Sequence, residues 1–148
     1  MADTKITPGT QHIKISPDAF RLWARDYFKC YLDFQSPRKF SPIPFFLCCR
    51  AIELALKGAL LDKDKSHKQL KKSYSHDLVK AYRAIPHEQQ TLSADALALL
   101  AAANDIYKAK DFEYFNIFDA VSAYKRFPDL EVLAALARRI TGYGAPAE

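Results

Sequence analysis

The chain has 148 residues, of which 49% are hydrophobic and 13% aromatic, so it can bury one core without disulfide or metal support. Its net charge is only +5 and its 17 acidic residues are spread along the chain, whereas a dedicated nucleic-acid binder carries a clustered basic excess. We therefore expect one globular domain at residues 16–141, between flexible segments at 1–15 and 142–148.

The cysteines and histidines form no metal-binding pattern. Three cysteines lie in apolar surroundings without a Cys-x-x-Cys spacing: Cys30, Cys48 and Cys49. Four histidines are scattered with no ligand spacing between any two: His12, His67, His76 and His87. We expect no disulfide, no metal and no cofactor.

The absence of a disulfide pattern predicts a cytoplasmic protein, and the hydropathy pattern predicts that it does not enter a membrane. Residues 1–15 contain no apolar run of the length that a secretory signal needs. Residues 42–61 are long enough to raise the question of a membrane span, but their three charges would be too costly in lipid.

Two Ser-Pro pairs predict helix starts. Ser16 and Pro17 are an N-cap and a first-turn residue. The helix that they open carries aromatic residues at spacings of three and four: Phe20, Trp23, Tyr27, Tyr31 and Phe34. After a proline-containing loop at residues 36–42, Ser41 and Pro42 repeat the signal and predict a central helix from Pro42 to Leu61. We expect this helix to be the longest and to be shielded from solvent on most sides.

The second half of the chain predicts three more helices and one irregular connection. Ser75 is the expected N-cap of a helix that ends before Pro86, and another helix runs from about Ser93 to Lys110. The aromatic-rich stretch at residues 111–127 has no clear period, which indicates a compact connection with one helical turn over one end of the bundle. A last helix follows Pro128 and ends at Gly142, its expected C-cap. The predicted fold is all-α, an up-and-down bundle of about five helices.

The central helix is almost wholly apolar, yet it carries three charges on one side. Arg50, Glu53 and Lys57 fall at offsets of zero, three and seven, which places them within about 60° of one another on a helix. We interpret them as an ion network within the helix. The alternative is that they line a groove and bind a phosphate or a partner's carboxylate.

The Glu53-x-x-x-Lys57 helix and the downstream Ser75-His76-Asp77-Leu78 together resemble the HEPN family of small prokaryotic helical bundles. The resemblance implies that Glu53, Lys57 and His76 are the positions that define the family pattern in this chain. His76 either donates to Glu53 or is a packed histidine, and packing is our interpretation.

The nuclease motif of the family is missing. HEPN ribonucleases carry an Arg-x(4–6)-His motif, and the nearest match here, Arg83-Ala-Ile-Pro-His87, is one residue too short and is interrupted by Pro86. The resemblance therefore supports the fold and argues against transferring the ribonuclease activity. An enzyme would be a metal-independent ribonuclease with a degenerate active site, drawn from Arg50, Lys57, His76, Arg83 and His87.

Two further features are candidates for nucleic-acid contact. A lysine run includes Lys71 and Lys72, but residues 62–77 hold five Lys against three Asp, which indicates a solvated loop rather than a phosphate patch. The aromatic residues after Asp111 could stack on bases, although core packing is the simpler account. The candidate ligand-binding residues are Arg50, Glu53, Lys57, His76, Asp77, Lys71, Lys72, Tyr107 and Tyr114.

The functional hypothesis is a non-catalytic HEPN-like binding or oligomerisation module of a prokaryotic stress, defence or toxin-antitoxin system. Its candidate ligands are a nucleotide, RNA or a nucleotidyltransferase partner, as the resemblance implies. We also expect a homodimer, because the central helix is apolar on more faces than one small bundle needs to cover.

Overall fold

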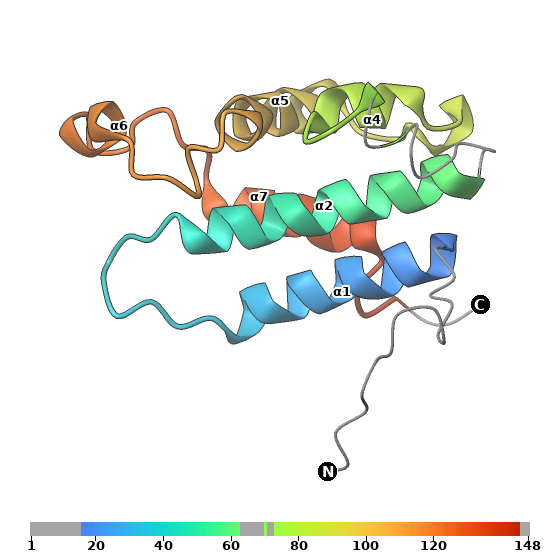
Figure 1. The fold of residues 1–148 in the computed structure, drawn as a ribbon, viewed down its shortest axis with the longest axis horizontal. Helices are drawn as coiled ribbons and strands as arrows, with labels where there is room; N and C mark the ends of the chain where they lie inside the picture. Colours follow the sequence, from blue (N-terminus) through green and yellow to red (C-terminus); the bar gives the residue numbers. More distant parts are fainter. Residues whose placement is uncertain (1–15, 63–69, 71–72, 146–148) are drawn as a thin grey trace, which may run out of the picture.

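The computed structural model describes residues 16–62, 70 and 73–145, and this part of the chain is all-helical, without strands. Its helices are α1 (Pro17–Asp33), α2 (Ile43–Asp62), α4 (Leu78–Ala84), α5 (Ala94–Lys108), α6 (Ile117–Val121) and α7 (Leu130–Thr141), with a 3-10 turn, η1, at His87–Gln89 (Figure 1). The all-α prediction is confirmed. The short α6 is the helical turn expected within residues 111–127.

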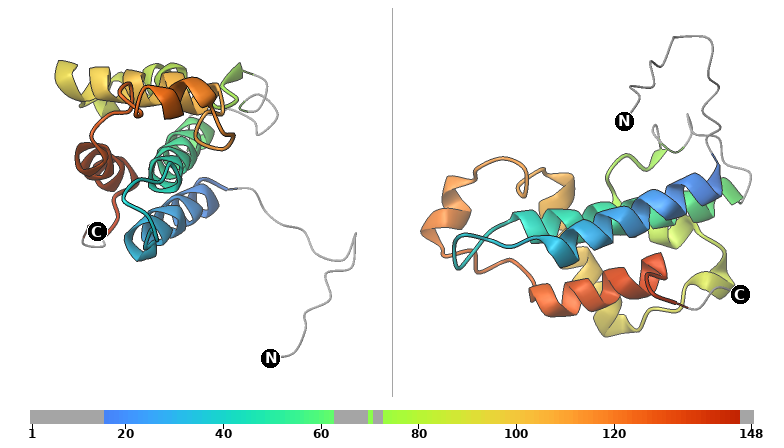
Figure 2. Two further views of the ribbon diagram at one scale, coloured as in Figure 1. Left: turned by 90° about the vertical axis from the view of Figure 1, so that its left-hand side faces the viewer. Right: turned by 90° about the horizontal axis from the view of Figure 1, so that it is seen from below.

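α2 is the centre of the fold. It contacts α1, α4, α5 and α7, and every residue from Pro44 to Leu61 is buried or half-buried. Figure 2 shows α2 end-on, with α1 and α7 beside it and α4 and α5 above it. The predicted shielding of this helix is confirmed. The reason given for dimerisation through α2 is wrong, because the chain covers the apolar faces of this helix itself.

The helices do not all run up and down. α1 and α2 lie side by side in opposite directions and α7 runs along them, but α5 crosses all three steeply (Figures 1 and 2). The predicted up-and-down arrangement is therefore wrong for α5. α4 has only seven residues, and the turn at η1 redirects the chain before α5 begins.

Side-chain caps fix the starts of α1 and α5 where the sequence predicts helices to begin, whereas α2 begins at Ile43, one residue later than predicted. The hydroxyl of Ser16 accepts from the backbone N–H of Ala19, and that of Ser93 accepts from Ala96. Gly142 ends α7 in the left-handed region at φ 68°, a conformation that glycine adopts without strain. The prediction for Ser75 is wrong: the cap of α4 is Asp77, which accepts from Lys80 N–H at 3.1 Å.

The buried face of α1 differs from the prediction. Ala24 and Phe28 are buried, whereas Trp23 is 62% exposed. A small residue on α2 contributes to this choice, because Gly58 allows α1 and α2 to approach closely. A Cβ atom on Gly58 would lie 3.2 Å from both the Cβ of Phe20 and the carbonyl oxygen of Pro17.

The connection between α5 and α7 is joined to the bundle by aromatic rings. Tyr124 stacks on Phe40 with ring centroids 4.0 Å apart, and Phe112 stacks on Phe45 at 5.7 Å. Phe127 meets these rings edge-on. For these three residues of the connection, core packing is the observed arrangement.

The residue after Gly142 packs against α1 and α7. Tyr143 packs its ring on Phe28, with centroids 5.2 Å apart, and Arg138 lies against both rings.

In the part of the chain that is described, no helix has the length and apolar character needed to span a bilayer. The flexible segment expected at residues 1–15 and the last three residues of the expected tail lie outside the described residues.

Candidate functional site

The side chain of Glu53 is 2% exposed and is surrounded by four hydrogen-bond donors. Its Oε2 atom accepts from Arg50 at 2.6 Å and from Lys57 at 3.3 Å. Its Oε1 atom accepts from Tyr107 Oη at 2.9 Å and lies 2.6 Å from Nδ1 of His76. Both carboxylate oxygens are therefore paired, which offsets the desolvation of a buried charge.

Three parts of the fold build this cluster. Arg50 and Lys57 are three residues before and four after Glu53 on α2, so the helical repeat places all three on one side. Tyr107 comes from the last turn of α5, and His76 comes from the segment that precedes α4. The cluster thus links α2 to α5 and to the start of α4. It is larger than the network predicted within α2 alone.

Burial and the charge of Glu53 both shift the pKa values of the donors Tyr107 and Arg50. Burial raises the pKa of Tyr107 well above its ordinary value, and the nearby Glu53 carboxylate raises it further, so the phenol stays a donor. Burial alone would lower the pKa of Arg50, but the charge of Glu53 raises it overall. The Arg50 guanidinium also lies 5.7 Å from the ring centroid of Tyr27.

The prediction of a packed histidine is wrong for His76. A carboxylate only accepts hydrogen bonds, so Nδ1 of His76 donates to Glu53. The side chain is 38% exposed, and its ring meets Tyr107 edge-on with centroids 5.8 Å apart. The ring therefore has one nitrogen fixed by Glu53, while Nε2 makes no hydrogen bond to another described residue.

Asn104 continues the polar contacts from α5 to α4. Its side-chain oxygen accepts from Leu78 N–H at 2.8 Å, and its amide nitrogen donates to Asp77 at 3.0 Å. Burial opposes ionisation of Asp77, but the bonds from Lys80 N–H and Asn104 lower its pKa overall. Sequence reasoning missed Asn104, although it stands one turn before Tyr107 as a polar residue within an alanine-rich helix.

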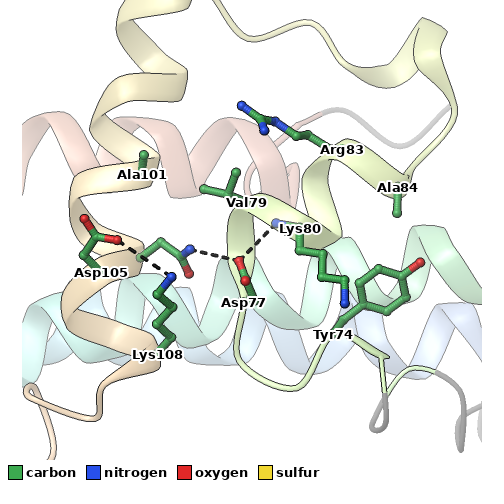
Figure 3. Close-up of a pocket in the computed structure, with 10 residues that line it drawn as sticks. Tyr74, Asp77, Val79, Lys80, Arg83, Ala84, Ala101, Asp105 and Lys108 are labelled. Atoms are coloured by element: carbon green, nitrogen blue, oxygen red, sulfur yellow. Dashed lines mark hydrogen bonds and ion pairs between the residues drawn. The ribbon is translucent and has the colours of Figure 1, made fainter.

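A surface pocket of about 570 Å³ lies between α4 and α5, next to this network. Tyr74, Lys80 and Arg83 lie on its α4 side, and Asn104 and Lys108 belong to α5. Figure 3 shows Asp77 between Lys108 and Lys80, with Arg83 at the far edge. The pocket thus offers cationic, carboxylate and aromatic groups to a ligand.

The three cationic side chains of the pocket differ in the partners that they contact. Lys108 lies 3.9 Å from Asp105, and Lys80 lies 5.7 Å from the ring centroid of Tyr74. The guanidinium of Arg83 has no hydrogen bond or ion pair to any other described residue, and Arg83 is exposed. Arg83 is therefore the group in this pocket most ready to take an external anion.

The remaining candidates do not join the Glu53 cluster. Arg83 lies in the pocket, while His87 is exposed in η1. Tyr114 is 66% exposed and precedes α6, at the other end of the molecule from α4 (Figure 1). Lys71 and Lys72, with the rest of the lysine run, lie outside the described residues.

Sequence reasoning singled out Arg50, Glu53, Lys57, His76 and Tyr107 as ligand-binding candidates, and the structure brings these five residues together. It missed Tyr74, Lys80 and Lys108, because solvated lysines and a lone tyrosine carry no local signal. Within the described ranges, no group of three histidine, cysteine or acidic residues could hold a metal ion. Comparison of the chain with protein-family models, curated proteins and solved structures gave no match.

Proposed function

We propose that the protein is a non-catalytic, HEPN-like binding module whose pocket between α4 and α5 takes the phosphate of a nucleotide, either free or within RNA. The observation that carries this proposal is the guanidinium of Arg83, which no other described residue pairs, in a pocket that also contains Lys80 and Lys108. A guanidinium binds two phosphate oxygens at once, and the two ammonium groups add charge.

The other groups of the pocket suit a nucleotide. Tyr74 is half-buried at the rim, where its ring can stack on a base. Asp77 is already bound by Lys80 N–H and Asn104, and Asp105 faces Lys108, so both carboxylates have partners other than Arg83. The pocket therefore combines positive charge at one edge with an aromatic face.

The Glu53 cluster has a positioning role in this proposal. Glu53 fixes His76, the residue before Asp77, and Asp77 caps the helix that carries Lys80 and Arg83. The buried network thus sets the position of the α4 side of the pocket without touching the ligand. The cellular setting follows the resemblance alone: a stress, defence or toxin-antitoxin system, with a nucleotidyltransferase as candidate partner.

Calorimetric titration with ATP and with a short single-stranded RNA tests the proposal. We expect Arg83→Gln to weaken binding of both probes by about tenfold or more, since a charge-assisted phosphate contact is worth about 1.5–3 kcal/mol. Lys125→Gln, which removes an exposed lysine outside the pocket, is the matched control. Equal affinities for the two variants, or no binding of either probe to the wild type, would contradict the proposal.

The second candidate is a metal-independent ribonuclease, and the geometry of His76 favours it. A histidine whose Nδ1 donates to a buried carboxylate has a fixed tautomer, in which Nε2 is the acceptor that a general base needs. Arg50 and Lys57 donate hydrogen bonds to the same carboxylate, that of Glu53. RNA cleavage that is lost in His76→Gln while the melting temperature is kept would promote this candidate over the binding module.

A further inference from the structure

The short helix α6 presents its apolar side to solvent. Ile117, Phe118 and Val121 lie within about 100° of one another on this helix and are 61%, 82% and 82% exposed. Asp119 lies on the opposite side of the helix and is buried. The usual arrangement of a surface helix, with apolar residues inward and charged residues outward, is reversed here.

Specific contacts hold α6 in this orientation. Arg126 donates to both carboxylate oxygens of Asp119, at 2.6 and 2.7 Å, and to Asp111 at 2.6 Å. Asn116 caps the helix by accepting from the N–H of Asp119 at 3.1 Å. Tyr124, which follows α6, stacks on Phe40 of the bundle. The outward-facing apolar surface is therefore built into the fold.

Two residues before the helix enlarge this surface. Tyr114 is 66% exposed and Phe115 is 80% exposed, and with Ile117, Phe118 and Val121 they form what we call the α6 face. An aromatic side chain offers about 150–250 Å², so the three rings alone expose roughly 350–550 Å². That area already reaches the size of the largest apolar patch on a typical monomer, about 300–600 Å². With Ile117 and Val121 added, it approaches the roughly 800 Å² that each partner buries in a stable interface.

The charges around the α6 face indicate what covers it. Residues 110–126 contain three basic and three acidic residues: Lys110, Lys125, Arg126, Asp111, Glu113 and Asp119. The net charge of residues 110–126 is therefore zero, although the whole chain has a net charge of +5. A neutral surface has no excess charge to attract an anionic membrane or RNA, and it does not repel a copy of itself.

We propose that the α6 face binds the α6 face of a second copy of this chain, forming a symmetric dimer. A two-fold axis lets one apolar patch bury itself and closes the assembly at two subunits. The aromatic side chains would form the core of the contact, and Lys110, Glu113 and Lys125 would stand at its polar rim. This contact lies apart from the pocket between α4 and α5 and does not depend on the proposed function (Figure 1).

Light scattering coupled to gel filtration of the full chain tests this proposal. We expect twice the chain mass of 16.8 kDa for the wild type at micromolar concentration. Phe118→Asp should raise the dissociation constant by about tenfold or more, because a central aromatic residue of an interface is a typical hot spot. Val132→Asp is the matched control, since Val132 is also exposed, at 52%, but belongs to α7.

Two more measurements make the result decisive. Far-UV dichroism and a cooperative unfolding transition should show that Phe118→Asp and Phe115→Ser are folded, because both residues are exposed; loss of the dimer should lower their melting temperature at micromolar concentration. A wild type that stays monomeric at micromolar concentration would overturn the proposal, as would a dimer that both variants leave intact. A monomer that sediments with phosphatidylserine vesicles through Phe118 would assign the face to a membrane instead. ATP binding by the same variants should be unchanged, which separates this contact from the pocket.

Discussion

At the scale of single residues, Glu53 shows how a charge is retained inside an apolar helix. Burying a carboxylate is unfavourable unless charged or polar donors replace the lost water, and Glu53 has four such donors from three parts of the fold. The donors in turn depend on Glu53 as their shared acceptor. Removing Glu53 would thus affect α2, α5 and the start of α4 together.

We expect Glu53→Ala to lower the free energy of unfolding by ~3–5 kcal/mol, because it leaves the half-buried Arg50 and Lys57 and the buried Tyr107 hydroxyl without their acceptor. Lys57→Met should cost less, about 1–3 kcal/mol, since it keeps the apolar stem and leaves Glu53 with three donors. Thermal melts of both variants measure the difference, at about 2–4 °C per kcal/mol for a domain of this size. Unchanged melting of Glu53→Ala, combined with lost ATP or RNA binding, would show that Glu53 belongs to a ligand site.

Two aspartates predict how stability depends on pH. The hydrogen bonds from Arg126 lower the pKa of Asp119, and those from Lys80 N–H and Asn104 outweigh burial and lower the pKa of Asp77. A carboxyl with a lowered pKa in the folded state contributes stability that is complete above its unfolded value of about 3.9 and is lost as the pH falls further. Denaturant unfolding should therefore show a stability that decreases below about pH 4.

The contribution of Asp119 can be separated with Arg126→Met. This variant removes the group that lowers the pKa of Asp119, so the stability lost between neutral and acidic pH should be smaller than in the wild type. Lys125→Met, which changes the neighbouring exposed lysine, should keep the wild-type dependence. If Arg126→Met and the wild type lost stability in parallel, the ion pair would not be the cause.

At the scale of helices, the starts and ends were predictable because they depend on nearby residues. Ser16, Ser93 and Gly142 act as caps through atoms within a few positions along the chain. The choice of buried face was not local: α1 buries Ala24 rather than Trp23 because α2 approaches closely at Gly58. Ser75 failed as a cap because Asp77 also binds Asn104, which lies on another helix.

The close approach of α1 and α2 can be tested with Gly58→Leu. A side chain at this position meets the Cβ of Phe20 and the backbone of Pro17, so α1 must move, and overpacking of this kind costs about 1–3 kcal/mol. Ala98→Leu is the control, because Ala98 is exposed on α5 and should change stability by less than about 0.5 kcal/mol. Denaturant unfolding of both variants gives the comparison; equal effects would mean that Gly58 does not set the helix spacing.

At the scale of the whole molecule, sequence periodicity predicted the helical class and the buried central helix, but not the crossing of α5. Crossing angles depend on which side chains meet across helices, and a single sequence does not contain that information. The same limit explains why the pocket of the candidate site could not be predicted from the sequence. The spacing of Glu53 and Lys57 is visible in the sequence, whereas the pocket exists only because α4 and α5 bring Arg83 and Lys108 to one surface.

The central claim is that the Glu53 cluster is structural and that the neighbouring pocket binds the ligand. Amide chemical-shift mapping of the full chain during titration with ATP tests it most directly. We predict saturable shifts at Tyr74, Lys80, Arg83 and Lys108, with α6 and the middle of α1 unchanged. Shifts centred on other surfaces, or none at millimolar ATP, would contradict the account.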